Sequence, residues 1–308
     1  MQGEGYDIIG DIHGCASSLD ALFDKLGYRT KNGVYRHEKR QVVFLGDFID
    51  RGPLQREVID IVRPMIEQGF ARSVMGNHEY NAIAYATENR NNSDYLRRHT
   101  PKNDRQHQAF LDAYPFNSLD YLAVIEWFKT LPLWLDAGDF RVVHACWDSK
   151  FIEQIGSPLL NEELLHASCD QTQWQNSAIE TLLKGREIPL PVGHFFHDKD
   201  GHARHDIRVR WWDSSANTYS MAFLGSQSAR SNIPDDEIEG DHLIDYAHDE
   251  PPVFLGHYWM EGEPELLAPN IACTDYSVAK PGGKLVAYRW NGEATLVRDN
   301  YVAVERVE

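Results

Sequence analysis

Three polar clusters, each directly after a short run of β-forming residues, constrain the fold of this chain more than any other feature. They read GDIHG at 10–14, GDFIDRG at 46–52 and GNHE at 76–79. The preceding β runs are 6–10, 41–45 and 71–75, and helical spacing of apolar residues follows over 17–26 and 54–68. Strand, loop and helix in repeated order predict a largely parallel sheet with helices on its faces.

The spacing of the clusters predicts that they converge. Asp11 and Asp47 are 36 residues apart, and Asp47 and Asn77 are 30 apart, about one βα unit in each case. Ligands in open α/β sheets bind at the carboxyl ends of the strands, where these clusters lie. His144 and His257 also follow apolar runs, and we expect them to end two late strands of the same sheet. Carboxylates, imidazoles and a carboxamide suit Mn, Fe or Zn, and there are enough of them here for two ions.

The rest of the chain predicts one domain, 1–308, with an insertion. Residues 80–130 have helical character, and a hairpin is expected over 133–144 around Gly138. Further strands are expected at 253–255, 271–274, 284–290 and 294–297. Residues 149–250 are interpreted as an insertion that caps the crevice, with a helix near 175–184. The histidine-rich segment 194–205 is interpreted as a hairpin turning at Asp200-Gly201 rather than as another metal site.

Taken together, these motifs resemble the calcineurin-like metallophosphoesterase superfamily. Within it, the chain is similar to the branch that holds the serine/threonine phosphoprotein phosphatases and the bacterial symmetrical diadenosine tetraphosphatases, whose motifs G-D-x-H-G, G-D-x-x-D-R-G and G-N-H-E are all complete here. The resemblance is strong over 6–80, moderate around His144 and His257, and absent over 149–250. It implies an α/β layered fold in which central mixed β-sheets are flanked by helices, with an inserted cap region.

The resemblance also implies a ligand set for two divalent ions, Mn being expected and Fe, Zn or Mg being alternatives. Asp47 would bridge both ions. The complete implied set, from the first ion to the second, is Asp11, His13, Asp47, Asn77, His144 and His257.

Four further residues are expected to act on the substrate. The resemblance implies that His78 protonates the leaving oxygen, that Asp50 orients His78, and that Arg51 holds the phosphate. An imidazole beside a carboxylate stays protonated to higher pH, and a guanidinium offers a planar fork to phosphoryl oxygens, so the chemistry fits these roles. For a second phosphate-binding arginine the candidates are Arg208 and Arg210. Both lie on one face of a predicted strand, and Arg210 is preferred.

The expected function is the hydrolysis of phosphomonoesters, as in the protein phosphatases, by direct attack of a metal-bridging hydroxide. The alternative is a symmetrical dinucleoside polyphosphate hydrolase acting on diadenosine tetraphosphate. A non-catalytic scaffold of the same fold is disfavoured, because it would have no reason to retain His78 and Asp50. Two departures bear on the substrate: His144 is followed by Ala145-Cys146 where the protein phosphatases carry Gly-Gly, and Asp275-Tyr276 differs from the diadenosine tetraphosphatase pattern.

Composition excludes several other classes. The formal net charge of −17 disfavours nucleic acid as a partner, and leaves a phosphorylated small molecule or a phosphoprotein as the expected substrate. No apolar run reaches the roughly 18–20 residues of a membrane span. The start of the chain lacks the features of a secretory signal, and the 4 cysteines are scattered, so we expect a reduced cytoplasmic protein.

Overall fold

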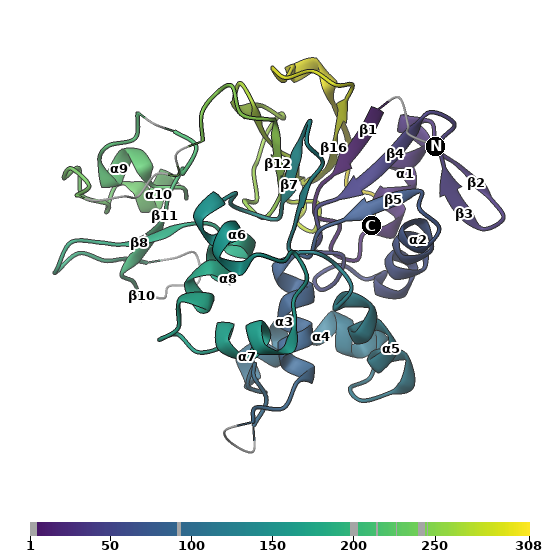
Figure 1. The fold of residues 1–308 in the computed structure, drawn as a ribbon, viewed down its shortest axis with the longest axis horizontal. Coiled ribbons are helices and arrows are strands. Elements are labelled where there is room, and N and C mark those ends of the chain that lie inside the picture. The colour runs from purple at the N-terminus through teal and green to yellow at the C-terminus, as the bar shows by residue number, and fades with distance from the viewer. Residues whose placement is uncertain are drawn as a thin grey trace.

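The computed structural model of the protein describes residues 5–90, 94–197, 203–213, 215–225, 227–239, 244 and 246–308 (Figure 1). Its helices are α1 (Ala16–Leu26), α2 (Gln55–Glu67), α3 (Asn77–Ala86), α4 (Pro101–Ala113), α5 (Leu119–Phe128), α6 (Ser149–Ile155), α7 (Glu162–Ser168), α8 (Trp174–Lys184), α9 (Tyr219–Ala222) and α10 (Gln227–Arg230), with a 3-10 turn at Arg298–Asn300. Among the described residues, no helix combines the length and the apolar character needed to span a bilayer.

The strands form two larger sheets and three two-stranded ribbons. They are β1 (Gly5–Ile9), β2 (Arg29–Lys31), β3 (Val34–Arg36), β4 (Arg40–Phe44), β5 (Ala71–Ser73), β6 (Trp134–Asp136), β7 (Arg141–Val143), β8 (Glu187–Pro189), β9 (Phe196–His197), β10 (Ala203–Arg204), β11 (Asp206–Arg208), β12 (Val253–Leu255), β13 (Leu266–Ala268), β14 (Ile271–Cys273), β15 (Asp275–Tyr276), β16 (Lys284–Trp290) and β17 (Tyr301–Glu305). The predicted α/β class with mixed sheets flanked by helices is confirmed.

The first sheet contains the three strands that precede the polar clusters. Its order is β15-β16-β1-β4-β5, with β17 on β16, and β1, β4 and β5 run parallel. Alternate residues of β1 enter different cores: Ile9 packs with the helices, whereas Ile8 packs toward the second sheet. This period of two lets both faces of the sheet be buried.

The second sheet corrects one prediction. His144 and His257 do not follow strands of the first sheet; they follow β7 and β12, which lie in a sheet of order β13-β14-β12-β7-β6. In that sheet β7, β12 and β14 are parallel. The prediction that both histidines end strands of the first sheet is therefore wrong. An apolar run predicts that a strand is buried, but it does not indicate which sheet the strand joins.

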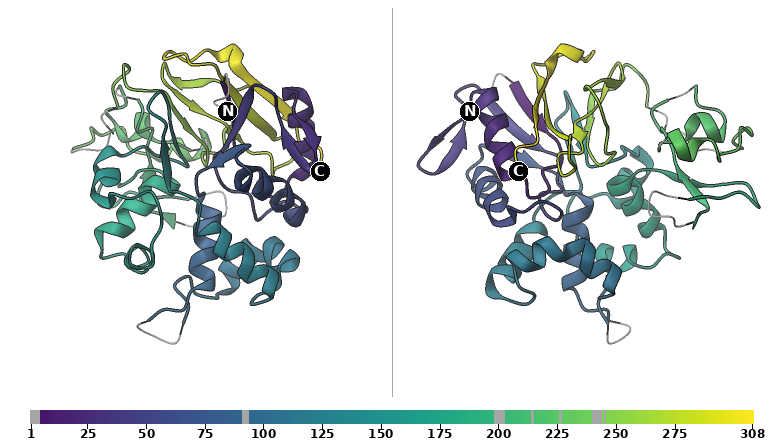
Figure 2. Two further views of the ribbon diagram at one scale, coloured as in Figure 1. Left: turned by 45° about the vertical axis from the view of Figure 1, so that its right-hand side comes forward. Right: turned by 180° about the vertical axis from the view of Figure 1, so that it is seen from behind.

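The two sheets pack face to face. The apolar layer between them contains Ile8 and Val43 from the first sheet and Val142 and Phe254 from the second, all fully buried. Phe254 contacts the ring of Tyr288 with centroids 5.1 Å apart. Figure 2 shows the two sheets side by side, with α1 and α2 covering the outer face of the first and α3, α4 and α5 grouped below. The sandwich fixes the strand ends of both sheets at one edge.

Residues 149–250 divide into two parts. Leu182 and Leu183 of α8 pack into the main core, whereas Ile207, Val209 and Phe223 belong to a separate small cluster. In Figure 1 this second part, with β8, β11 and α9, projects away from the sheets. The expected helix near 175–184 and the hairpin around Gly138 are confirmed as α8 and as β6 with β7.

The segments 294–297 and 194–205 differ in how they compare with the sequence-based expectations. The expected strand at 294–297 is wrong: this segment is irregular, and the last strand is β17. The pairing of β9 with β10 agrees with the expected hairpin, but its turn at Asp200-Gly201 lies outside the described residues.

Candidate active site

The carboxyl ends of strands from both sheets meet at the candidate site. The loops after β1, β4 and β5 carry the three polar clusters, and those after β7 and β12 carry His144 and His257. Of the nine described non-glycine residues with positive φ, six lie in these loops: His13, Asp47, Asp50, Arg51, His257 and Trp259. Backbone in the left-handed region costs energy for such residues, and this kind of strain gathers at functional sites.

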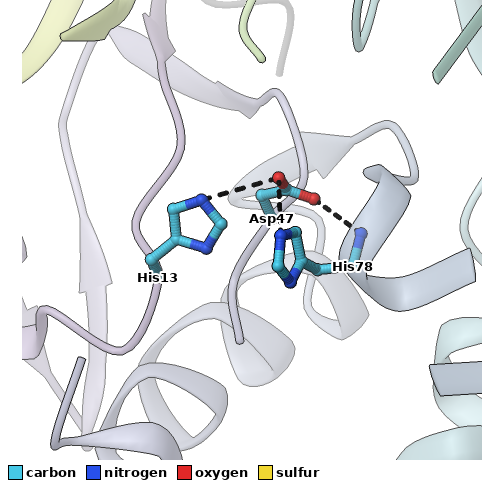
Figure 3. A group of neighbouring side chains, drawn as sticks. All are labelled: His13, Asp47 and His78. Carbon is cyan, nitrogen blue, oxygen red and sulfur yellow. Dashed lines mark hydrogen bonds and ion pairs between the residues drawn. The ribbon is translucent and has the colours of Figure 1, made fainter. Parts of the chain in front are cut away.

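A first group of ligand atoms comes from His13, Asp47 and His78. One ligand atom from each lies within 4.8 Å of the other two, and all three side chains are buried. Asp47 Oδ2 is 3.6 Å from His13 Nε2 and 3.9 Å from His78 Nε2. Figure 3 shows both imidazoles directed at the same carboxylate, His13 from the loop after β1 and His78 from the first turn of α3. The resemblance implies that His78 transfers a proton, so the proposed acid lies directly beside the proposed metal ligands His13 and Asp47.

A second group shares Asp47 and adds His144 and His257 within the same 4.8 Å limit. His144 Nε2 is 3.4 Å from Asp47 Oδ2. Asn77 Oδ1 lies 3.2 Å from His144 Nε2 and 2.7 Å from His257 Nδ1, so the carboxamide faces the same space. The structure therefore brings together two overlapping groups joined by one carboxylate.

Two buried imidazole nitrogen atoms in these groups have no hydrogen-bond partner within the part of the chain that the structure describes, which indicates whether metal ions would fit here. Nε2 of His13 and Nε2 of His257 are buried and have no hydrogen-bond partner among the described residues. His13 Nδ1 donates to the Ile49 carbonyl at 2.9 Å, which leaves Nε2 as the unprotonated atom facing Asp47. Burial and then His78 lower the pKa of His13 to about 3. A neutral imidazole held by a carbonyl is the usual form of a metal ligand, so these residues fit divalent ions.

Asp11 lies in the loop after β1, two residues before His13. Its carboxylate accepts the His257 backbone N–H at 3.1 Å, and it is not part of either group of ligand atoms. Burial, followed by the charge of Asp275, raises its pKa. Gly256 allows this approach, because a Cβ at that position would collide with Asp11 Oδ1. A cation beside Asp11 would relieve the repulsion between the two carboxylates.

The surroundings of Asp47 keep its carboxylate charged. Burial would raise its pKa, but the imidazoles of His144, His78 and His13 outweigh burial and lower the pKa well below its usual value. Asp47 Oδ1 also accepts the His78 backbone N–H at 2.9 Å. Asp47 is thus fixed and ionised at the point that the two groups of ligand atoms share.

His78 and Asp50 form a close pair. His78 Nδ1 lies 2.5 Å from Asp50 Oδ2, and both side chains are buried. Burial would lower the pKa of His78, but Asp47 and Asp50 outweigh it and raise the pKa. For Asp50 the effects have the opposite sign: burial would raise its pKa, but His107 and His78 outweigh burial and lower it. The pair therefore holds a proton on an imidazole whose Nε2 faces the site, as a general acid requires.

The three candidate arginines have different surroundings. Arg51 is exposed, and its guanidinium carbon lies 3.8 Å from the ring centroid of Trp259. Arg208 lies 3.3 Å from Glu187, and its charge contributes, after burial, to lowering the pKa of His257. Arg210 is half-buried, and burial followed by Arg230 lowers its pKa. The sequence pattern favours Arg210, whereas of these two arginines it is Arg208 whose charge, after burial, helps to lower the pKa of His257.

Three residues of the site, Glu79, His107 and Trp259, have no role assigned from the sequence. Glu79 is the last residue of the GNHE motif, so the motif points to it. Asp275, considered in the sequence only for its departure from a family pattern, opens β15 beside the site. His107 lies inside α4 and Trp259 two residues after His257, and neither has a motif that predicts its contacts.

The comparison with known families decides the membership of the chain. A family model described as calcineurin-like phosphoesterase matches residues 6–279. The chain belongs to the calcineurin-like phosphoesterase family. The resemblance predicted from the motifs is thereby confirmed, and calcineurin-like phosphoesterases use a dinuclear divalent metal centre, which agrees with the two groups around Asp47.

Similarity to individual proteins is more local. The bis(5'-nucleosyl)-tetraphosphatase PrpE [asymmetrical] of Bacillus subtilis is 55% identical over 74 residues, which are 24% of this chain and 30% of that protein. The protein of the same name from Oceanobacillus iheyensis is 49% identical over 73 residues, 23% of this chain and 29% of that one. The chain thus matches less than a third of the length of these relatives.

Among solved structures, a protein serine/threonine phosphatase from Saccharomyces cerevisiae, with similarity to human phosphatase PP5, has a similar fold. The TM-score is 0.51 at 16% identity, and the match covers 98% of this chain and 80% of that one. At this identity the likeness concerns the calcineurin-like fold alone.

Proposed function

We propose that the protein is a dinuclear metal-dependent phosphoesterase and that a bis(5'-nucleosyl)-tetraphosphate is its first candidate substrate. The observation that carries the enzymatic part is the pair of ligand groups sharing Asp47, with buried unpartnered Nε2 atoms on His13 and His257. The substrate part is supported by the names of the relatives that share 73 or 74 residues with the chain. These names favour the nucleotide alternative over the phosphomonoester expected first from the sequence.

The proposed ligands are those implied by the sequence resemblance: Asp11, His13, Asp47, Asn77, His144 and His257. Divalent ions held there supply activation of the attacking water and neutralisation of phosphate charge. Mn²⁺ is the first ion to test, because oxygen and imidazole donors are mixed.

The chain's own residues supply orientation and the proton. Arg51 is proposed to hold the phosphoryl oxygens, since its exposed guanidinium is fixed over Trp259. His78 is proposed to deliver a proton from Nε2 to the leaving oxygen, while Asp50 holds Nδ1. A nucleotide leaving group with several phosphates needs this proton less than an alkyl alcohol does. One site with this acid can therefore hydrolyse both dinucleoside polyphosphates and phosphomonoesters.

The segment after α8 is proposed to narrow the approach to this site, as expected for a cap. Support comes from Trp211, whose indole N–H donates to the Tyr258 hydroxyl at 3.0 Å, next to His257. The segment thus contacts the loop that follows β12.

The deciding experiment is a substrate panel with metal-stripped and Mn²⁺-loaded protein. Diadenosine tetraphosphate, p-nitrophenyl phosphate and a phosphopeptide are compared by kcat/KM, and the nucleotide products are separated. ADP alone indicates symmetrical cleavage, whereas ATP with AMP indicates asymmetrical cleavage. Hydrolysis of none of these by the loaded protein would reject the proposed enzyme class, and a phosphopeptide preference would reject the proposed substrate.

A further inference from the structure

The indole ring of Trp259 is shared by two cations beside the candidate metal centre. The Arg51 guanidinium carbon lies 3.8 Å from its centroid, and Lys280 Nζ lies 4.4 Å away. The His13 imidazole is 5.9 Å from the same ring, centroid to centroid. A single aromatic side chain therefore links a proposed ligand, the proposed phosphate-binding arginine and a lysine from a distant loop.

Trp259 is held in place by its backbone. Its φ is 55°, a left-handed value that a bulky residue adopts only when its surroundings impose it. Its backbone N–H donates to Asp275 Oδ2 at 2.7 Å, and Asp275 is buried. The ring position is thus built into the loop between β12 and β13.

A cavity of about 290 Å³ lies on the side of Lys280, the lysine that contacts this ring, and its lining includes Met260, Ser277, Lys280, Gly282 and Gly283. Lys284 also lines it, but two carboxylates engage this lysine, Glu263 at 2.6 Å and Glu305 at 3.5 Å. Lys280 faces Glu261 at 3.9 Å, and that glutamate side chain is 83% exposed. An exposed pair at this distance contributes little, so an anion with higher charge can replace the glutamate.

We propose that Trp259 and Lys280 form a subsite for the phosphates that follow the transferred one in a phosphoanhydride chain. The subsite rests on the proposed function, in which Arg51 holds the transferred phosphoryl group. Two cations on one ring repel each other, and a chain of linked phosphates that contacts both relieves this repulsion. A phosphomonoester has no second phosphate and leaves Lys280 unused.

The test compares Lys280→Met with Lys102→Met, a matched loss of charge at an exposed position of α4. Competitive inhibition by pyrophosphate and by orthophosphate is measured with p-nitrophenyl phosphate as substrate, with free Mn²⁺ in excess of both anions. Lys280→Met should weaken pyrophosphate inhibition about tenfold more than orthophosphate inhibition, since a charge-assisted contact is lost. Lys280→Arg should restore most of the difference, and Lys102→Met should leave the ratio unchanged.

Equal weakening of both anions, or no weakening of pyrophosphate, would overturn the subsite while the phosphoesterase proposal stands. If the wild type hydrolyses no phosphate ester, the proposed function fails instead. Calorimetric binding of pyrophosphate to wild type and Lys280→Met then decides the subsite, because equal affinities would reject it.

A second, independent observation concerns the other oxygen of Asp50. His107 Nδ1 lies 2.8 Å from Asp50 Oδ1, so the carboxylate stands between the imidazoles of His107 and His78. All three side chains are buried. The His107 ring packs against Phe110 at 4.9 Å and Tyr85 at 5.3 Å between centroids.

We infer that His107 is a positioning residue for the acid. Its Nε2 is buried without a partner among the described residues, so its contact to the site is made through Nδ1 alone. A donor at Nδ1 holds Oδ1 of Asp50 and leaves Oδ2 in line with His78. The rotamer of Asp50, and through it the orientation of the His78 imidazole, is thereby fixed from α4.

His107→Phe keeps the ring and removes the donor, whereas His107→Asn places an amide N–H near the position of Nδ1. We expect His107→Phe to lower kcat for an alkyl phosphate about tenfold more than for p-nitrophenyl phosphate, because only the alkyl leaving group needs the proton. KM and bound metal should change little, and His107→Asn should recover part of the loss. If His107→Phe lost equal kcat on both substrates, or if His107→Asn lost as much as His107→Phe, His107 would be a packing residue and not a positioning residue.

Discussion

Glu79 Oε2 accepts the backbone N–H of Asp47 at 2.8 Å. The same carboxylate accepts the N–H of Phe48 at 2.8 Å through Oε1 and the N–H of Gly76 at 3.0 Å. The last residue of the third motif therefore ties the loop of the second motif to the start of α3. Gly76 must be small for this arrangement, because a Cβ there would collide with Asp47 Oδ1.

Glu79→Ala should destabilise the protein strongly. Three buried N–H groups lose their acceptor, and an unsatisfied buried donor costs roughly 1–3 kcal/mol, so we expect a loss of about 3 kcal/mol or more in the free energy of unfolding. Glu79→Gln keeps one oxygen acceptor and should lose less. Urea denaturation of the two variants checks this order, and equal stability of Glu79→Ala and wild type would contradict it.

Asp47→Asn should release metal and activity together. Asp47 is the one carboxylate common to both ligand groups, and the change removes its charge while keeping its shape. Changes around metal ligands cost roughly 10- to 100-fold, and loss of a shared ligand charge should exceed this range. Metal content per chain measured by mass spectrometry should fall, whereas Asp60→Asn on the exposed face of α2 should retain it. Full metal content with normal turnover would refute the shared role.

His78→Ala should discriminate between leaving groups. General-acid catalysis contributes about 10²- to 10⁴-fold when the leaving oxygen is basic. The loss of kcat should therefore be much larger for an alkyl phosphate than for p-nitrophenyl phosphate. His166→Ala in α7, outside the site, serves as the control. A uniform loss on both substrates would indicate a ligand or packing role for His78, which also belongs to the first group of ligand atoms.

Much of the fold and site was predictable from local patterns. The runs that became β1, β4 and β5 each precede a motif, and their buried residues, such as Val42 and Val43, serve two different cores. Parallel strands bring their ends together, so the convergence of Asp11, Asp47 and Asn77 follows from topology.

The rest depends on tertiary contacts that local patterns do not encode. The residues of a short apolar strand do not indicate which sheet the strand joins, so the sequence alone does not predict that β7 and β12 lie in the second sheet. The contact of His107 with Asp50 spans 57 residues and has no motif. The sharing of Trp259 by Arg51 and Lys280 likewise joins loops that are distant in the sequence.

The cysteines should react in an order set by burial. Burial, followed by Glu308, raises the pKa of the Cys15 thiol to about 12, and burial also raises the pKa of Cys146 and Cys273. Thiolate is the reactive form, so these three thiols should resist iodoacetamide at pH 8 and react when the protein unfolds. Cys169 is only half-buried and should react first, although burial raises its pKa too. Timed alkylation with peptide mapping checks the order, and early labelling of Cys146 would contradict it.

Arg208 and Arg210 provide the sharpest test of the cap. Both alternate with buried Ile207 and Val209; Arg208 ends β11 and Arg210 lies two residues beyond it, and their charges act in different places. The charge of Arg208, after burial, helps to lower the pKa of His257, whereas burial and then the charge of Arg230 lower the pKa of Arg210. We expect Arg208→Ala to raise KM and weaken phosphate inhibition several-fold more than Arg210→Ala, with metal content unchanged in both variants. Phosphate inhibition constants measured beside metal analysis decide between them. A larger effect of Arg210→Ala would return the second phosphate-binding role to the residue that the sequence preferred, and loss of metal in Arg208→Ala would assign that arginine to the support of His257 instead.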